Sequence, residues 1–515
     1  TVNGSNLGTG GTLTSTTSAT SPMVGIRHTA TGNGLAITGN TIQGLQNGTT
    51  AGGVLTGITA TGAVAASQTV NVSNNLLGTA TNALINYPFA NTGTGNLGIN
   101  VTGSTSATTH LIENNNFRGI TYTATSGNSG TWAFITFTAG TAAADSASIK
   151  GNSFTNMTIN TTGAVTFISH NYIVAATGRQ YITNNSIVTQ FTKSGAGGSI
   201  TGTTSTSNSV TGAVINISNN NFSNITSSSA AGVTNACTIS GIVNTDGANS
   251  TTSYPTKTIN GNTLSNWTSG TGAVLGMDLN YYNAASSISN NTIYNITDSA
   301  AITGINFKTG GGATGSLSFS GNTVAKLTSR GVAGAIIGIN QATASGALAY
   351  IGTVNFNGNT IDTLTTALKT TSSNVTGYFI GANVGPVQNI YKNKVYNLSA
   401  GKDSANSSAT VYGMQINGGT TVTAYNNLIS NLDANTDTTT NGVIGVNVSG
   451  GTTVNLYHNT ISVAATSTAG NFGSSGVYAA TAPALTMINN IISNTSSKGT
   501  GKTVAYRRAS GTVAT

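Results

Sequence analysis

The chain has 515 residues, only 5% of them charged, and its 17 basic and 9 acidic side chains give a formal net charge of +8. The basic residues are scattered and no basic run with interleaved aromatic residues occurs, so we expect no nucleic-acid partner. No apolar stretch approaches the roughly 18 residues of a membrane-spanning helix, and the single cysteine, Cys237, excludes an internal disulfide.

The repeats of the chain leave little room for separate domains. Residues 1–21 contain no charged side chain and no helical periodicity, and we expect them to form a lead-in. Repeats occupy residues 22–508, and residues 509–515 form a tail, so we expect one continuous domain over residues 1–515. Because the first residue is Thr1 rather than Met, either an export signal has been removed or the chain is a segment of a longer protein.

A nine-residue pattern recurs fourteen times: apolar-x-(Asn/Gly)-Asn-x-apolar-x-x-apolar. Successive copies lie 29 to 42 residues apart, about 35 on average, which is typical of one supersecondary unit stacked on the next. We therefore predict a solenoid of about 14 coils. The Asn at the centre of the pattern falls at Asn40, Asn75, Asn115, Asn152, Asn185, Asn220, Asn262, Asn291, Asn322, Asn359, Asn393, Asn427, Asn459 and Asn490.

Two apolar positions accompany each of these Asn residues. The residues three before and two after the Asn are apolar in every copy, as in Ile288 and Ile293 around Asn291. A helix would need apolar residues three and four apart over ten or more positions, whereas these pieces are short, often β-branched and interrupted by Asn and Gly. The pattern predicts short strands joined at a bend, with both apolar positions facing a core.

The residue types at the bend favour a left-handed backbone turn. The residue before the central Asn is Gly or Asn in twelve copies, with Lys392 and His458 as the exceptions, and Gly and Asn enter the left-handed region most readily. With coils stacked at about 4.8 Å, each central Asn amide can donate to the next coil and accept from the previous one, which predicts an Asn ladder. A second column, four residues on, is also partly Asn: Asn156, Asn224, Asn266, Asn295, Asn397, Asn431 and Asn494.

Each period carries a further strand of the form apolar-x-Gly-apolar, which predicts one such strand per coil. Weaker copies include Val24-Gly25-Ile26 and Gly57-Ile58. The clear copies are Ile239-Ser240-Gly241-Ile242, Ile302-Thr303-Gly304-Ile305, Ile336-Ile337-Gly338-Ile339, Phe379-Ile380-Gly381-Ala382, Val411-Tyr412-Gly413-Met414 and Val443-Ile444-Gly445-Val446.

Two phrases resemble the repeats of a known family. Ile288-Ser289-Asn290-Asn291-Thr292-Ile293 and Leu456-Tyr457-His458-Asn459-Thr460-Ile461 are similar to repeats of right-handed parallel β-helix proteins of the pectin-lyase-like architecture, and more narrowly to large secreted bacterial surface proteins. The resemblance implies an all-β, single-stranded, right-handed parallel β-helix outside the cell or at its surface. It implies no single function, because lyases, hydrolases, adhesins and phage spikes share this coil.

The acidic residues do not form a recognisable pair of catalytic carboxyl groups in the sequence. Glycoside hydrolysis needs two carboxyl groups about 5 to 9.5 Å apart, and in sequence only Asp433 and Asp437 are close. Asn244-Thr245-Asp246-Gly247 is similar to the first motif of polygalacturonase-type hydrolases, but the later motifs of that family are missing. No metal-ligand His pair, calcium repeat or phosphate loop occurs. We therefore expect no catalytic residue, no metal and no cofactor.

One outward position changes character late in the chain. The residue two before the central Asn is polar in the first ten coils and then becomes Tyr391, Tyr425, Tyr457 and Ile488, beside Lys392 and His458. Such an aromatic strip can stack on sugar rings or anchor a protein partner, or the tyrosines can simply pack on the sheet. The three tyrosines, Lys392 and His458 are the candidate binding residues.

We expect a noncatalytic, secreted structural or adhesive protein, with a carbohydrate-active or carbohydrate-binding β-helix as the alternative. A β-helix exposes unpaired backbone groups at an open end, so we also expect end-to-end association with an identical subunit or an adjoining domain, and glycans or cell surfaces as partners. Alternatively, the basic group Lys498, Lys502, Arg507 and Arg508 guards one end.

Overall fold

The computed structural model describes residues 1–8, 13–15, 23–47, 53–102, 108–123, 127–138, 146–227, 236–247, 254–308, 315–331, 334–342, 352–367, 373–381, 387–401, 408–435, 437–467, 469–480, 483–497 and 499–509. In these residues the regular structure is β-strand, and no helix is long and apolar enough to cross a membrane. The chain divides into two compact units, Thr1–Ala248 with Thr252–Gly270, and Asn249–Thr251 with Thr271–Thr515. Whether the units form one continuous domain stays a prediction.

In unit 1 each coil contributes a strand before the ladder Asn, short strands after it, and a strand with the Gly motif. We call these pre-corner, post-corner and glycine strands. The pre-corner strands are β1 (Val2–Asn3), β5 (Leu35–Thr38), β9 (Thr69–Ser73), β13 (Thr109–Glu113), β17 (Ser146–Lys150), β21 (Arg179–Thr183), β25 (Val214–Ser218) and β28 (Thr256–Asn260). The glycine strands are β4 (Met23–His28), β8 (Leu55–Ala60), β12 (Asn96–Thr102), β16 (Trp132–Thr138), β20 (Val165–Asn171), β24 (Ser199–Ser205) and β27 (Thr238–Asn244).

The post-corner segments of unit 1 are mostly split in two. Directly after the corner come β2 (Asn6–Leu7), β6 (Thr41–Ile42), β10 (Leu76–Leu77), β14 (Asn116–Arg118), β18 (Ser153–Thr155) and β22 (Ser186–Ile187). The second pieces are β3 (Leu13–Ser15), β7 (Leu45–Asn47), β11 (Ile85–Tyr87), β15 (Ile120–Tyr122), β19 (Met157–Ile159), β23 (Phe191–Lys193) and β26 (Ile225–Ser227). In β29 (Thr263–Thr268) the two pieces are one strand.

Unit 2 repeats the arrangement more regularly. Its pre-corner strands are β31 (Ser287–Ser289), β34 (Ser316–Ser320), β37 (Thr353–Asn357), β40 (Val387–Tyr391), β43 (Thr421–Tyr425), β46 (Thr453–Tyr457) and β49 (Ala484–Ile488). Its post-corner strands are β32 (Thr292–Asp298), β35 (Thr323–Ser329), β38 (Thr360–Thr366), β41 (Lys394–Ser399), β44 (Leu428–Asp433), β47 (Thr460–Val463) and β50 (Ile491–Asn494). Its glycine strands are β30 (Val274–Leu279), β33 (Ile302–Lys308), β36 (Ile336–Ala342), β39 (Val375–Ile380), β42 (Val411–Ile416), β45 (Val443–Val448), β48 (Ser474–Ala479) and β51 (Thr503–Arg508).

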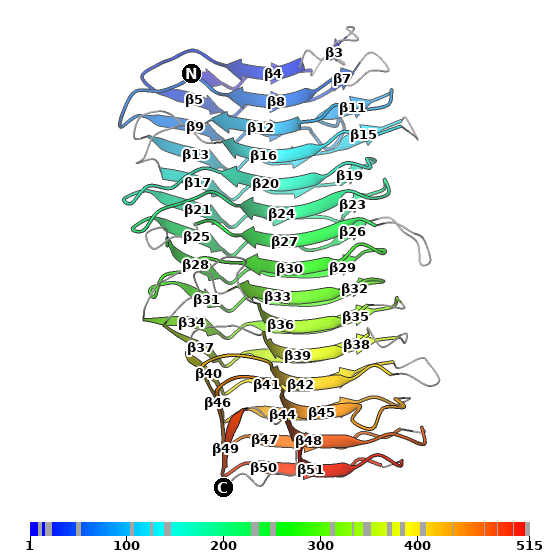
Figure 1. Ribbon diagram of the computed structural model, residues 1–515. Helices are drawn as coiled ribbons and strands as arrows, with labels where there is room; N and C mark the ends of the chain where they lie inside the picture. Colours follow the sequence, from blue (N-terminus) through cyan, green and yellow to red (C-terminus); the bar gives the residue numbers. More distant parts are fainter. Residues whose placement is uncertain are drawn as a thin grey trace. The chain divides into compact units, whose positions relative to one another are not determined.

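Strands of one kind pair in parallel with their counterparts in the neighbouring coils of their unit, so the chain is a parallel β-solenoid, as predicted. Figure 1 shows the glycine strands β33, β36 and β39 lying side by side, one per coil. The predicted register is confirmed, since Phe356 pairs with Ile390 and Ala424 pairs with Leu456. The inward apolar columns are almost completely buried, as Ile390 and Val395 at 0% exposure illustrate.

The predicted corner and ladder are confirmed. The residue before the ladder Asn has a positive φ in all fourteen copies, between 52° and 66°, including Lys392 and His458. Within each unit the ladder amide donates through Nδ2 to the Oδ1 of the next ladder Asn, at 2.9 Å from Asn40 to Asn75 and 3.0 Å from Asn359 to Asn393. Most of the second Asn column is a second left-handed position, because six of its seven members, all but Asn494, also have positive φ.

One glycine assignment from the sequence is wrong. We expected Gly381 to align with Gly338 and Gly413 of the neighbouring glycine strands. Tyr378 pairs instead with Ile339 and with Met414, the residues that follow these two glycines, so the aligned glycine is Gly377. A Cβ at Gly377 would lie 2.5 Å from both the Val395 Cγ1 and the Gly413 oxygen, so only glycine fits at this position. Ala382, the last residue of the expected motif, lies outside the described residues.

Candidate binding surface at the ladder corner

The last four ladder coils of unit 2 carry an unusual set of outward side chains at the corner. We call the outward residues just before and just after Asn393, Asn427, Asn459 and Asn490 the corner ridge. Its twelve members are Tyr391, Lys392, Lys394, Tyr425, Asn426, Leu428, Tyr457, His458, Thr460, Ile488, Asn489 and Ile491. The pairing of β40, β43, β46 and β49 aligns Tyr391, Tyr425, Tyr457 and Ile488 in one column.

The same corner is small and polar in the earlier coils of unit 2. The equivalent positions are Ser289, Asn290, Thr292, Ser320, Gly321, Thr323, Asn357, Gly358 and Thr360. The backbone of the corner is unchanged, since the left-handed residues Gly358 and Lys392 have φ of 62° and 56°. The ridge is therefore a change of surface chemistry on a constant scaffold.

Two of the predicted tyrosines stack on each other. The ring centroids of Tyr391 and Tyr425 are 4.7 Å apart and the ring planes differ by 5°. The Asn357 Nδ2 donates to the Tyr391 hydroxyl at 3.1 Å from the preceding coil. Each of the two rings thus covers one face of the other, which leaves less ring face for a sugar than an isolated tyrosine offers. The pKa of Tyr425 is raised by partial burial and by the neighbouring Tyr391.

The predicted basic members lie beside the tyrosines. Lys392 and His458 are exposed at the corner itself, and the structure adds Lys394, exposed on the first post-corner position. Lys392 and His458 occupy left-handed backbone positions that cost side-chain-bearing residues other than Asn about 1 kcal/mol or more. No ridge position is acidic.

Sequence reasoning placed Ile488 at an outward position but missed the other two apolar members of the ridge, Leu428 and Ile491. Leu428 is 37% exposed, Ile488 48% and Ile491 67%. They face outward because of their register: Leu428 and Ile491 each pair with Thr460, and Ile488 pairs with Tyr457. Ile488 and Ile491 also lie on β49 and β50, the last strands of their sheets, which raises their exposed fractions above that of Leu428. The fixed positions of Leu428 and Ile491 relative to the ladder Asn were a signal in the sequence, but only the column of Tyr391, Tyr425, Tyr457 and Ile488 stood out there.

The carboxyl group of the hydrolase-like motif is buried rather than displayed. Asp246 is 0% exposed; its Oδ1 accepts from the Ser209 N–H at 2.8 Å and its Oδ2 from the Ser205 hydroxyl at 3.0 Å. The buried Lys257 donates to the Asp246 main-chain oxygen at 2.6 Å. Burial raises the pKa of Asp246 and lowers that of Lys257 to about 7. A polymer in solvent has no access to this group.

Three further carboxyl groups, those of Asp278, Asp298 and Asp437, are ion-paired or buried. Asp298 and Asp437 are buried, and burial raises their pKa values to about 7 and about 6. Asp278 is ion-paired with Lys308 at 2.9 Å. In the described part of the chain no group of three or more His, Cys, Asp or Glu is placed to hold a metal, while Asp145 and Asp403 lie outside that part.

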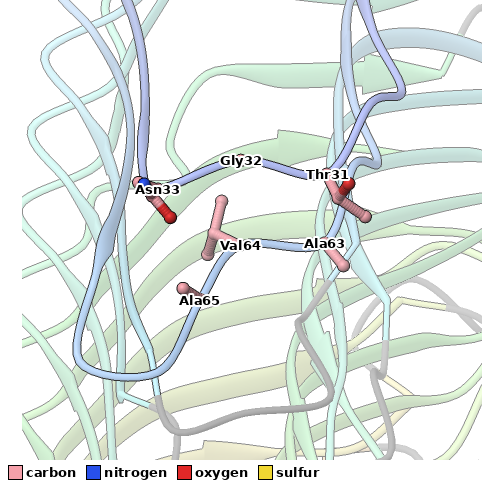
Figure 2. A pocket seen from close by; sticks show the side chains of 6 residues that line it. All are labelled: Thr31, Gly32, Asn33, Ala63, Val64 and Ala65. Carbon is pink, nitrogen blue, oxygen red and sulfur yellow. The ribbon is translucent and has the colours of Figure 1, made fainter.

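Two pockets in the described part of unit 1 are lined by small or polar, uncharged residues. The larger of the two has a volume of about 530 Å³. Figure 2 shows its lining residues on two loops, with Thr31, Gly32 and Asn33 on one and Ala63, Val64 and Ala65 on the other. Its two loops are joined by a bridge between Gly32 and Val64. A smaller pocket of about 210 Å³ is lined by Gly8, Gly44, Thr81, Asn82, Ala83, Asn86 and Thr121.

A scan against protein-family models, a search of curated proteins and a search of solved structures each found no match.

Proposed function

We propose that this chain is a noncatalytic extracellular protein with a structural or adhesive role, of the pectin-lyase-like kind that builds large secreted bacterial surface proteins. The corner ridge is the observation that carries the proposal. It concentrates three tyrosines, three exposed aliphatic side chains and two lysines on one edge, and it contains no carboxyl group. Exposed apolar patches with a polar rim are typical of interaction sites.

The stacked coils support a structural role. The ladder amides of Asn322 and Asn359 are fully buried and bonded to both neighbouring coils, so coils reinforce one another as in other repeat proteins. The absence of a catalytic role is supported by the burial of Asp246, whose two carboxylate oxygens are both engaged.

Activity assays on polygalacturonate, alginate and neutral glycans test this proposal. We expect no product from the full chain, and no difference between the chain and an Asp246→Asn variant. Reproducible cleavage that disappears in Asp246→Asn would falsify the noncatalytic proposal and favour a carbohydrate-active β-helix.

A carbohydrate-binding role is the second candidate. A row of outward amides and hydroxyls runs beside the tyrosines, and within it the Asn389 Nδ2 donates to the Asn355 Oδ1 at 2.9 Å. Such groups hydrogen-bond sugars, so a glycan array with the Tyr457→Ala variant as comparison would reveal this role.

We further propose that copies associate end to end through continued strand pairing. Parallel stacking is the contact that each coil already makes with its neighbours, and unpaired strand edges template association. Electron micrographs of the full chain are expected to show filaments, whereas separate single particles at high concentration would contradict this proposal. Part of the lead-in, and Lys498 of the basic group, lie outside the described residues.

A further inference from the structure

The corner ridge is convex. At each of its coils a left-handed residue turns the chain from the pre-corner to the post-corner strand, and the ladder Asn after it points inward at 1–3% exposure for Asn393, Asn427 and Asn459. Outward side chains on the two sides of the corner therefore diverge from a common edge. Four coils at about 4.8 Å give this edge a length of about 14 Å.

The chemistry of the ridge is ordered around this edge. Leu428 is 37% exposed on an inner strand, and Ile488 and Ile491 flank the last corner at 48% and 67%, where β49 and β50 have a neighbouring strand on one side only. Tyr391, Tyr425 and Tyr457 line the pre-corner side, while Lys392 and Lys394 stand at the first of the four coils. Aliphatic tips, flanking tyrosines and nearby lysines are the combination that lies in a membrane interface.

Other occupants fit this edge less well. Sugars and peptides are usually held in concave sites, and Tyr391 and Tyr425 each already cover one face of the other ring. A second copy would bring few acids to the ridge lysines, because the chain has only 9 acidic residues, of which Asp246, Asp298 and Asp437 are buried.

We propose that the corner ridge docks on an anionic lipid bilayer, with Ile488, Ile491 and Leu428 entering the interface and Lys392 and Lys394 contacting lipid headgroups. The inference rests on the proposed adhesive function and names its partner. Each basic side chain at an anionic surface contributes about a fivefold gain in partitioning, and each buried aliphatic group adds to it.

The test is cosedimentation of the full chain with phosphatidylcholine vesicles, either pure or containing about one third phosphatidylglycerol. We expect binding to the anionic vesicles that weakens with added salt, and much weaker binding to the neutral ones. Lys392→Gln/Lys394→Gln should reduce partitioning about 25-fold, and Ile488→Ser/Ile491→Ser at least about tenfold.

Matched variants separate the ridge from general charge and hydrophobicity. Lys326→Gln/Arg330→Gln removes the same charge from exposed positions off the ridge, and Ile173→Ser/Val188→Ser removes aliphatic groups that are 46% and 56% exposed. Both controls should bind anionic vesicles like the unmodified chain. Equal losses in controls and ridge variants, or no binding to anionic vesicles, would overturn the inference. Ridge-dependent binding to a glycan or protein without vesicle binding would overturn it as well, yet leave the adhesive function standing.

Discussion

The side-chain amide of Asn359 is bonded to the coils on both sides. Its Nδ2 donates to the Asn393 Oδ1 at 3.0 Å and to the Phe319 oxygen at 3.1 Å, and its Oδ1 accepts from the Asn322 main-chain N–H at 2.9 Å. Asn359→Ala leaves several buried groups unpaired and should lower the free energy of unfolding by about 3 kcal/mol. Denaturant unfolding would measure it. Asn389→Ala, which removes an outward amide, should cost under about 1 kcal/mol, and equal costs would refute the ladder's importance.

Lys392 has a left-handed backbone conformation that Asn adopts at lower energy than Lys. Its φ is 56°, and Asn occupies the same corner position at Asn426 with φ of 53°. Lys392→Asn should therefore raise the free energy of unfolding by about 0.5 to 1 kcal/mol. Thermal unfolding of the variant beside Lys394→Asn, which changes the same charge on an ordinary strand position, checks the prediction. A gain in both variants would trace the effect to charge rather than to backbone conformation.

At the scale of the element, the glycine strands carry one glycine at the same position in neighbouring coils, such as Gly377, Gly413 and Gly445. These aligned glycines set how closely the glycine strand approaches the post-corner strand. A Cβ on Gly413 would lie 2.4 Å from the Ile429 Cγ2 and 2.6 Å from the Gly445 oxygen. Gly413→Ala should cost about 1 to 3 kcal/mol by overpacking. In Gly413→Ala/Ile429→Ala the removal of the Ile429 Cγ2 should return part of that loss, so a double-mutant cycle should give a favourable coupling. Strict additivity would show that the two residues do not share this contact.

Strand type and register could be read from the sequence because each coil repeats the same constraint. The ladder Asn and the apolar residues around it, such as Ile390 and Val395, must align in every coil, and a one-residue slip would turn the apolar side chains outward. Gly377 was missed because the Gly381 motif looks equally good locally, and only the contact with Val395 distinguishes them. Leu428 and Ile491 were missed because exposure of an apolar residue depends on what else covers the corner.

At the scale of the whole molecule, buried histidines and buried carboxyl groups should make opposite contributions to the pH dependence of stability. In unit 1 burial lowers the pKa of His110 to about 4 and that of His170 to about 3, and the ring of His170 packs 5.1 Å from Phe137. Unfolding lets both histidines bind protons near pH 6.5, so their contribution is complete above that pH and is lost as the pH falls toward 3. In unit 2 Asp298 and Asp437 have raised pKa values of about 7 and about 6, so the folded unit loses stability as the pH rises from about 4 to 7.

Unfolding midpoints across pH 3 to 8 would separate these effects. His170→Phe should flatten the acid side of the profile, and Asp298→Asn should flatten the decline toward neutral pH. Thr297→Ser, next to Asp298 but without a titrating group, serves as the control. Unchanged profiles in both variants would mean that these groups do not govern the pH dependence.

The direction of the inter-coil hydrogen bonds has a mechanical consequence. In unit 2 they run from one coil to the next, so tension that separates neighbouring coils loads one set of bonds at a time, as in a zipper, rather than shearing all of them together. Each rupture should then free one period of chain, 31 to 37 residues between successive ladder Asn from Asn291 to Asn490. Single-molecule pulling on the full chain should show a sawtooth of low, evenly spaced peaks, and a single high rupture peak would contradict it. The coils of unit 2 should therefore unfold one at a time under load and refold one at a time when the load is released.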